Sequence, residues 1–255
     1  MTADNEFMWA ADLHTHTLVS DHAFNTITEM ARAASEKGFW AMAVTDHGPA
    51  MPDSPHRWYF YNLKTLPDRM ENVWVLKGVE ANVIDAEGTL DFSERDIRLF
   101  SFDWMIASLH SDIVKPGMTE DECTQLWLNL AANPAVDMIG HSETPAFRYD
   151  YDAVVQEFAR HGKVVEWNAN SAVVRPGGEK NLWELARACK KANARIAVSS
   201  DAHSIYHLGV FDTVLPILRK LDYPEELIVN LSRENLVQEL KRHGKAIAEK
   251  MEETL

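Results

Sequence analysis

WAADLHTH, at residues 9–16, is an apolar run that ends in two histidines. Five later runs end in the same way, at histidine or a carboxylate: AMAVTDH (41–47), VLKGVE (75–80), MIASLH (105–110), DMIGH (137–141) and IAVSSDAH (196–203). The ends recur about every 30 residues, which is the length of one βα unit. A (β/α) barrel gathers the C-terminal ends of its strands into one mouth, so these polar ends are predicted to meet there.

Short apolar runs alternate with longer segments of helical periodicity, which is typical of parallel βα units. We therefore predict an α/β fold, a single seven-stranded, TIM-like (β/α) barrel domain over residues 1–255 with its active site at the C-terminal ends of the strands. The expected strands lie near residues 8–14, 40–46, 73–80, 103–109, 136–141, 163–168 and 195–200. The expected helices cover residues 26–38, 119–133, 150–162, 181–193 and 232–244, and residues 81–92 read as a small β-hairpin.

Charge and composition argue against a nucleic acid or a membrane as the binding partner. The formal net charge of −14 opposes a nucleic acid held by its phosphates, because such binding proteins carry a basic face. No apolar run approaches the ~20 residues of a membrane span. The N-terminal segment MTADNEF carries acidic residues where a signal peptide would carry lysine or arginine. We therefore expect a cytoplasmic protein without membrane contact. The two cysteines, Cys123 and Cys189, lie in helical segments and are expected to be buried or idle thiols.

The strongest signal for a metal site is DLHTH at residues 12–16. The period of two along a strand places Asp12, His14 and His16 on one face, so the two imidazoles point the same way. The same spacing returns in DAH at residues 201–203, after the last apolar run. Histidines on a solvated loop are the plain alternative, and the repeated position at successive strand ends argues against it.

Single candidate ligands lie between these two segments. The full set is His14, His16, His22, His47, Glu80, His110, His141, Asp201 and His203. Nine ligands exceed what one zinc takes and suit three divalent ions, with Glu80 from a middle strand as the bridging carboxylate. Closely spaced ions lower the pKa of a bridging water and absorb the charge of a transferring phosphoryl group, which predicts hydrolysis of a phosphate ester. His161 and His243, by contrast, precede glycines in last helical turns and are expected to be helix caps.

These motifs, in this order, resemble those of the polymerase and histidinol phosphatase (PHP) superfamily and, within it, the YcdX-like metal-dependent phosphatases. The resemblance runs nearly end to end and rests on DLHTHTLVSDHAFNT (12–26), VTDHGPAMPDSPHRWYF (44–60), KGVEAN (77–82), SLH (108–110), GHSETP (140–145), EWNANS (166–171) and SSDAH (199–203). It implies a distorted seven-stranded barrel, a trinuclear site that most often holds zinc, and phosphoester hydrolysis. Manganese and iron remain alternatives to zinc.

The resemblance also implies how the ligands divide among the ions. One ion takes His14, His16, Glu80 and Asp201; Glu80 bridges to a second with His110 and His141; and the third takes His22, His47 and His203. After His141 this chain reads Ser-Glu-Thr-Pro where the branch commonly has Pro-Gly. This departure is expected to bring Glu143 near the mouth.

The expected reaction on a small phosphate monoester is in-line attack by a metal-bridging hydroxide. Two carboxylates, Asp12 and Asp46, are expected to orient ligand imidazoles, and His56 to protonate the leaving oxygen. Three arginines in loops that follow strands are predicted to bind the substrate phosphate: Arg57, Arg148 and Arg175.

Three other functions stay open. An amidohydrolase-like barrel that cleaves C–N or C–O bonds also begins with His-x-His, but such sites usually recruit a lysine where this chain has Glu80 and His110. A PHP-type nuclease needs a groove for a nucleic-acid strand, which the acid excess opposes. A metal-storing or metal-sensing module predicts the same ligands without an open coordination position. The sequence leaves the physiological substrate and the oligomeric state undetermined.

Overall fold

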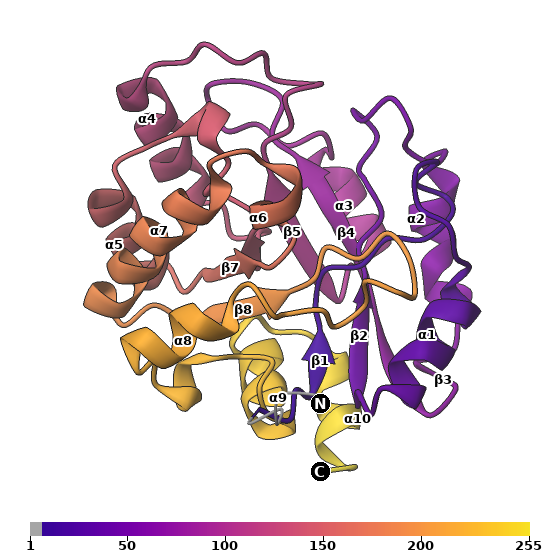
Figure 1. The fold of residues 1–255 in the computed structure, drawn as a ribbon. Helices are drawn as coiled ribbons and strands as arrows, with labels where there is room; N and C mark the ends of the chain where they lie inside the picture. The colour runs from indigo at the N-terminus through magenta and orange to yellow at the C-terminus, as the bar shows by residue number, and fades with distance from the viewer. Residues whose placement is uncertain (1–6) are drawn as a thin grey trace.

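The computed structural model describes residues 7–255, and most of the acidic N-terminal segment, residues 1–6, lies outside this range. Its centre is a nearly closed barrel of seven parallel strands in the order β1-β2-β4-β5-β6-β7-β8 (Figure 1). The strands are β1 (Ala11–Asp12), β2 (Ala41–Val44), β4 (Val73–Asn82), β5 (Trp104–Ser108), β6 (Met138–Ile139), β7 (Val164–Asn168) and β8 (Ile196–Ser199). The predicted seven-stranded barrel is confirmed, although β1 and β6 are shorter than expected.

Two short hairpins interrupt the alternation of strands and helices. β3 (Arg69–Met70) pairs antiparallel with the start of β4. The residues between them, Glu71 and Asn72, have φ of 49° and 68°, as a type I′ turn requires. The predicted hairpin at residues 81–92 also forms, because Val83 and Leu90 make an antiparallel bridge across it.

Five of the α-helices in the described range begin at a side chain that caps them. The α-helices are α1 (Ile27–Glu36), α2 (Trp58–Asn62), α3 (Glu94–Phe100), α4 (Glu120–Ala131), α5 (Tyr151–Arg160), α6 (Ser171–Val174), α7 (Gly178–Ala192), α8 (Leu215–Leu221), α9 (Arg233–Arg242) and α10 (Ile247–Glu252). The 3₁₀-helices are η1 (Leu63–Thr65), η2 (Pro145–Phe147) and η3 (Glu225–Leu227). The five capped helices are α1, α3, α4, α5 and α9, and Thr26 and Thr119 close capping boxes at α1 and α4. All five predicted helices form, but α7 begins before the expected Asn181, and α10 follows the helix that was expected to be the last.

The barrel closes imperfectly between β1 and β8, a junction that we call the seam. Backbone pairing there is limited to a bridge between Thr15 and Ala202, in which the amide of His16 donates to the Ala202 carbonyl at 2.8 Å. Nearer the N-terminal ends of the strands, the buried Asn230 side chain fills the gap. Its amide nitrogen donates to the carbonyls of Ala11 and Val198, at 2.8 and 2.7 Å, and its oxygen accepts from the Val198 amide at 3.1 Å. One side chain thus replaces the missing strand-to-strand hydrogen bonds.

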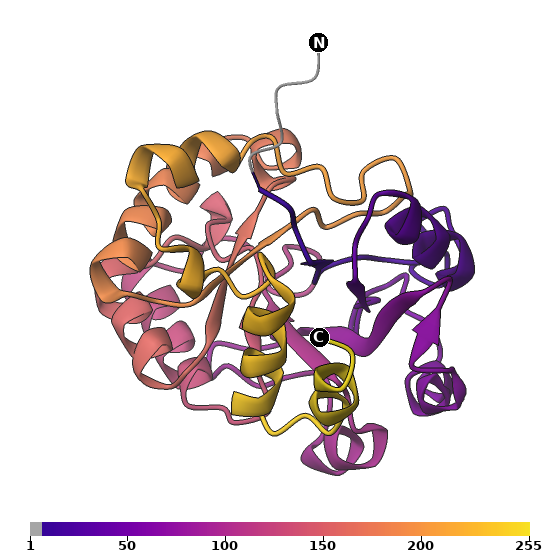
Figure 2. The ribbon, with the colours of Figure 1, turned by 90° about the horizontal axis from the view of Figure 1, so that it is seen from below.

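The C-terminal helices cover the end of the barrel opposite the mouth (Figure 2). Leu236 and Leu240 of α9 and Met251 of α10 share a buried apolar cluster with Trp104 and Val164, which start β5 and β7. The mouth is left as the open end. No helix within residues 7–255 is long and apolar enough to cross a membrane.

Candidate metal centre

The strand ends bring the predicted ligands to one cavity of about 480 Å³ at the mouth. Seven of the nine line it: His22, His47, Glu80, His110, His141, Asp201 and His203. His14 and His16 are fully buried beside them. Two of these ligands have backbone in the left-handed region, with φ of 23° at His141 and 51° at Asp201. This geometry costs about 1–2 kcal/mol per residue outside glycine, and it turns each side chain sharply off the end of its strand.

Four side chains of the cluster, those of His14, His16, Glu80 and Asp201, have ligand atoms spaced as they would be around a single metal ion. Two ligand atoms about 2.0–2.1 Å from a tetrahedral ion lie about 3.3 Å apart. His14 Nε2 is 3.1 Å from His16 Nε2, 3.4 Å from Glu80 Oε1 and 3.6 Å from Asp201 Oδ1. His16 Nε2 is 3.2 Å from the same Asp201 oxygen. These four side chains therefore fit one metal ion.

Glu80 lies at the middle of the cluster and is shared by several imidazoles. Its Oε1 is 2.9 Å from His141 Nε2 and 3.5 Å from His110 Nε2, whereas its Oε2 is 2.8 Å from His47 Nδ1. Burial alone would raise the pKa of Glu80, but the surrounding imidazoles hold it well below its usual range. The two oxygens of Glu80 thus face different imidazoles, Oε1 those of His110 and His141 and Oε2 that of His47.

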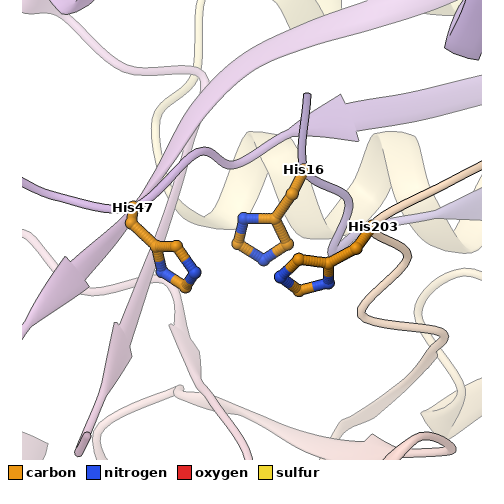
Figure 3. Close-up of side chains that lie close together, drawn as sticks. All are labelled: His16, His47 and His203. Carbon is orange, nitrogen blue, oxygen red and sulfur yellow. The ribbon is translucent and has the colours of Figure 1, made fainter. Parts of the chain in front are cut away.

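Three imidazole rings of the cluster, those of His22, His47 and His203, lie close together. The His22 and His203 rings stack at 4.4 Å, and the His22 and His47 rings at 5.2 Å. Figure 3 shows His47 and His203 with His16, their rings turned toward a common space. A carboxylate that the sequence did not suggest, Asp53, joins this group through a hydrogen bond with His22 Nδ1.

Hydrogen bonds hold several ligand imidazoles with one nitrogen turned toward the cluster. Glu166 Oε1 lies 2.7 Å from His14 Nδ1, and Asn82 Oδ1 lies 2.8 Å from His110 Nδ1. A backbone carbonyl does the same for His203, 2.8 Å from its Nδ1. Each contact leaves Nε2 free for a metal and fixes the tautomer. Sequence reasoning missed Glu166 and Asn82 as orienting residues; the available signal was a polar residue inside an otherwise apolar strand, β7 or β4.

Several buried donor atoms have no hydrogen-bond partner among residues 7–255. They are His16 Nδ1, His47 Nε2 and His203 Nε2, while His47 Nδ1 and Glu80 Oε2 have only each other, 2.8 Å apart. An unpartnered buried polar atom costs roughly 1–3 kcal/mol, so such a group of atoms in one place needs a ligand. Nitrogen and carboxylate donors of this kind are those that zinc and related divalent ions take. The residues present therefore fit a resident metal.

Asp12 and Asp46 have roles that differ from the prediction that each orients an imidazole. Asp12 accepts hydrogen bonds from the amides of Ser200 and Gly209, at 3.3 and 3.0 Å, and ties β1 to the segment after β8. Burial raises the pKa of Asp12 to about 6, although these bonds lower it. Asp46 accepts from the Thr17 amide at 2.7 Å and the Tyr59 hydroxyl at 2.5 Å. Both carboxylates position backbone next to the ligands, and neither contacts a ligand ring.

Of the four residues predicted to handle the substrate, only Arg175 lies in the cavity. Its Nη1 donates to Ser171 Oγ at 2.9 Å, and its Nη2 lies 3.4 Å from Asp201 Oδ2. Arg57 instead pairs with Asp96 on the outer side of α3, and Arg148 with Glu184 on α7. The exposed His56 ring accepts from the amide of Trp58 and does not line the cavity. The carboxylates that neutralise these arginines come from distant segments, which a loop position does not reveal.

The structure also gives the positions of Glu143 and of the remaining histidines, those outside the predicted ligand set. Glu143 lies near the mouth as expected, since it bonds to Ser171, which also holds Arg175; it is fully buried, and burial raises its pKa to about 7. His207 does line the cavity. His161 ends α5 as expected, and His243 ends α9 but is also largely buried, 3.1 Å from Asp137 and 3.0 Å from Glu239.

The geometry agrees with what known proteins show. The model of the PHP domain matches residues 12–170 of this chain. The chain belongs to the PHP domain family. It is 41% identical over 242 residues to a probable phosphatase of Acetivibrio thermocellus, with 95% of this chain and 99% of that protein covered. It is 42% identical over 237 residues to a probable phosphatase of Caldanaerobacter subterraneus, with 92% of each covered. With these relatives, the PHP chain is a metal-dependent hydrolase of the phosphatase class.

A solved PHP structure shares the fold. Histidinol phosphate phosphatase from Lactococcus lactis superposes with a TM-score of 0.60 at 17% identity, covering 88% of this chain and 97% of that one. That protein was crystallised with zinc, L-histidinol and phosphate. At this identity the likeness concerns the fold alone.

Proposed function

We propose that this PHP protein hydrolyses small phosphate monoesters at a centre of three divalent ions, with zinc as the favoured metal. The observation that carries the proposal is that seven of the nine predicted ligands and one arginine line a single cavity of about 480 Å³, with His14 and His16 buried beside it. A volume of this size suits a small organic molecule. The zinc and phosphate bound by the Lactococcus lactis enzyme support the same chemistry.

We assign the ligands to the three ions as the family resemblance implies. His14, His16, Asp201 and Glu80 form the first set, whose donor atoms are 3.1–3.6 Å apart. Glu80 reaches the second set through His110 and His141. His22, His47 and His203 form the third set, and Asp53 holds His22 from behind.

The three ions, when bound, supply Lewis acidity for the phosphoryl group and activation of water. The chain's own residues supply orientation and proton transfer. Arg175 is held by Ser171 and Asp201 with its guanidinium in the cavity, where its planar donors suit phosphate oxygens. His207 lines the same cavity and, in place of His56, is the imidazole available to give a proton to the leaving oxygen.

The cavity does not favour a nucleic-acid strand. Apart from histidines, Arg175 is the one cationic side chain among its lining residues in the described range 7–255. A polynucleotide would need a row of such contacts, and the net charge of −14 repels it.

Metal reconstitution tests the proposal. Protein stripped by a chelator is reloaded with zinc, manganese or iron, and bound metal and hydrolysis of phosphomonoesters are measured together. We expect three equivalents of metal and activity that depends on it, with Asp201→Ala losing metal and most activity. Fewer than two equivalents, together with unchanged activity in Asp201→Ala, would contradict the proposal.

The arginines provide a matched comparison. Arg175→Ala should raise KM for a phosphomonoester by about tenfold, because a hydrogen bond to a charged group contributes roughly 1.5–3 kcal/mol. Arg57→Ala removes the same side chain outside the cavity and should change KM less than about twofold. Equal effects of the two substitutions would remove Arg175 from the phosphate site.

A further inference from the structure

One wall of the metal-site cavity is made of aliphatic side chains. Val173 and Val174 of α6, Val210 from the segment after β8, and Met51 from the segment after β2 all line it. The first three are strongly exposed, at 74%, 53% and 43%. Solvent-exposed aliphatic side chains gathered on one concave wall, next to polar ligands, mark a binding surface.

This wall has a fixed position relative to Arg175. α6 ends at Val174, and Arg175 follows it directly, so the aliphatic pair and the guanidinium share one short element. The Asn168 side chain accepts from the amides of Asn170 and Ser171, at 2.9 and 3.1 Å, and so holds the start of α6. The Arg175 amide donates to the Ser171 carbonyl at 3.0 Å and holds its end. A phosphate held by Arg175 would therefore place its organic group beside Val173 and Val174.

The rest of the lining offers little to a charged or sugar-like group. Within the described part of the chain, no lysine lines the cavity. The hydroxyl of Thr213 is already used, because it donates to the Ala169 carbonyl at 2.6 Å. Asn170 is one of the few polar side chains left on this side. A second phosphate or a polyhydroxyl group would lose its hydration here without matching partners.

We infer that Val173, Val174, Val210 and Met51 form a subsite for an uncharged, mainly apolar leaving group, so that the substrates are phosphate monoesters of small alkyl or aromatic alcohols. This inference rests on the proposed phosphatase function and adds the substrate class to it. Water carries out the hydrolysis: the P–O bond to the alcohol breaks, a P–O bond to water's oxygen forms, and the alcohol leaves with a proton.

Binding of phosphonates tests the subsite without turnover. Zinc-loaded protein is titrated calorimetrically with benzylphosphonate and with 2-hydroxyethylphosphonate, which present an apolar and a polar group on the same anion. We expect benzylphosphonate to bind at least about tenfold more tightly, since one or two buried methylene equivalents are worth that much. Equal binding, or tighter binding of the hydroxyethyl compound, would overturn the inference.

Variants locate the preference on this wall. The double variant Val173→Asn, Val174→Asn should reduce the preference to below about threefold, and Val210→Asn is a second variant, from the segment after β8. Leu99→Asn changes an aliphatic side chain of 46% exposure on α3, outside the cavity lining, and should keep the full preference. An unchanged preference in both cavity variants would overturn the assignment of the subsite.

Hydrolysis separates this inference from the function on which it rests. Benzyl phosphate and glycerol 1-phosphate release alcohols of similar acidity, so their kcat/KM ratio reports recognition. A ratio above about ten that falls in the double variant supports the subsite. Hydrolysis of both esters at equal kcat/KM would overturn the subsite and leave the phosphatase function standing. Hydrolysis of neither ester, with no phosphonate bound, would overturn the function and the inference together.

Discussion

Glu166→Gln should weaken metal binding while leaving the fold intact. Glu166 is fully buried in β7, and its carboxylate serves three donors at once. Its Oε1 holds His14 Nδ1 at 2.7 Å and also accepts from Ser199 Oγ, and its Oε2 accepts from the His141 amide at 2.5 Å. It thereby positions His14 and His141, which we propose as ligands of two different ions.

The size of the effect follows from these contacts. Glutamine keeps the volume but has one acceptor oxygen, so its NH₂ group must face either His14 and Ser199 or the His141 amide. The charge-assisted bond to His14 becomes a neutral one or is lost, which costs roughly 1.5–3 kcal/mol. Loss of such an orienting partner typically weakens metal affinity about 10–100-fold, or about 1.4–2.7 kcal/mol. We expect a decrease of that size for the most tightly bound ion.

Competition with a chromophoric zinc chelator measures the affinity, and thermal unfolding of the metal-free protein measures the fold. Glu239→Gln is the matched control, because Glu239 is also fully buried but pairs with Arg195, Arg242 and His243 near the N-terminal ends of the strands. It should lower stability and leave zinc affinity within about twofold. Zinc affinity unchanged in Glu166→Gln, or reduced equally in both variants, would refute the orienting role of Glu166.

Three further predictions concern the rest of the barrel. Asn230→Ala removes three buried hydrogen bonds from the seam and should lower the free energy of unfolding in urea by about 3 kcal/mol, whereas a loss below about 1 kcal/mol would contradict its closing role. Burial lowers the pKa of His243, but Asp137 and Glu239 raise it above its usual value overall, so His243 stabilises the fold below its unfolded pKa and loses this effect as pH rises. His243→Gln should therefore cost about 1–2 kcal/mol at pH 6 and less at pH 9 in paired urea titrations, and a cost that grows with pH would reverse the argument. Burial raises the pKa of Cys189 to about 12 and also raises that of Cys123, so neither thiol should react with a disulfide reagent at pH 8 until the protein unfolds; fast reaction of the native protein would contradict this.

The barrel and the candidate ligand set could be predicted because both depend on local pattern. An apolar run followed by histidine or carboxylate identifies a parallel strand and its C-terminal end together. The helix ends were predictable for the same reason, since Thr26 and Thr119 carry their capping glutamates three residues later. The expected strand boundaries differ from the observed ones by a few residues, because polar residues at the mouth continue the chain past the last hydrogen bond between the strands.

Side-chain partners across the barrel could not be predicted. Glu166 and His14 are 152 residues apart, and their contact depends on the curvature of the sheet. Arg57, Arg148 and Arg175 all lie in loops that follow strands. Arg57 and Arg148 each pair with a carboxylate outside the cavity, whereas the carboxylate beside Arg175 is that of Asp201, which lines the cavity. Tertiary placement decided among three residues that looked equivalent in sequence.

The seam explains why Asp12 is a structural neighbour of the site. The segments that follow β1 and β8 supply His14, His16, Asp201 and His203, yet the two strands have almost no backbone pairing with each other to hold them in register. Asp12 makes the missing connection in the middle of the seam, because it accepts from Ser200, the residue before Asp201. Metal ligands within about 0.5 Å of their required positions need such support. Asp12, which is not itself a predicted metal ligand, thus fixes the distance between the ligands that follow β1 and those that follow β8.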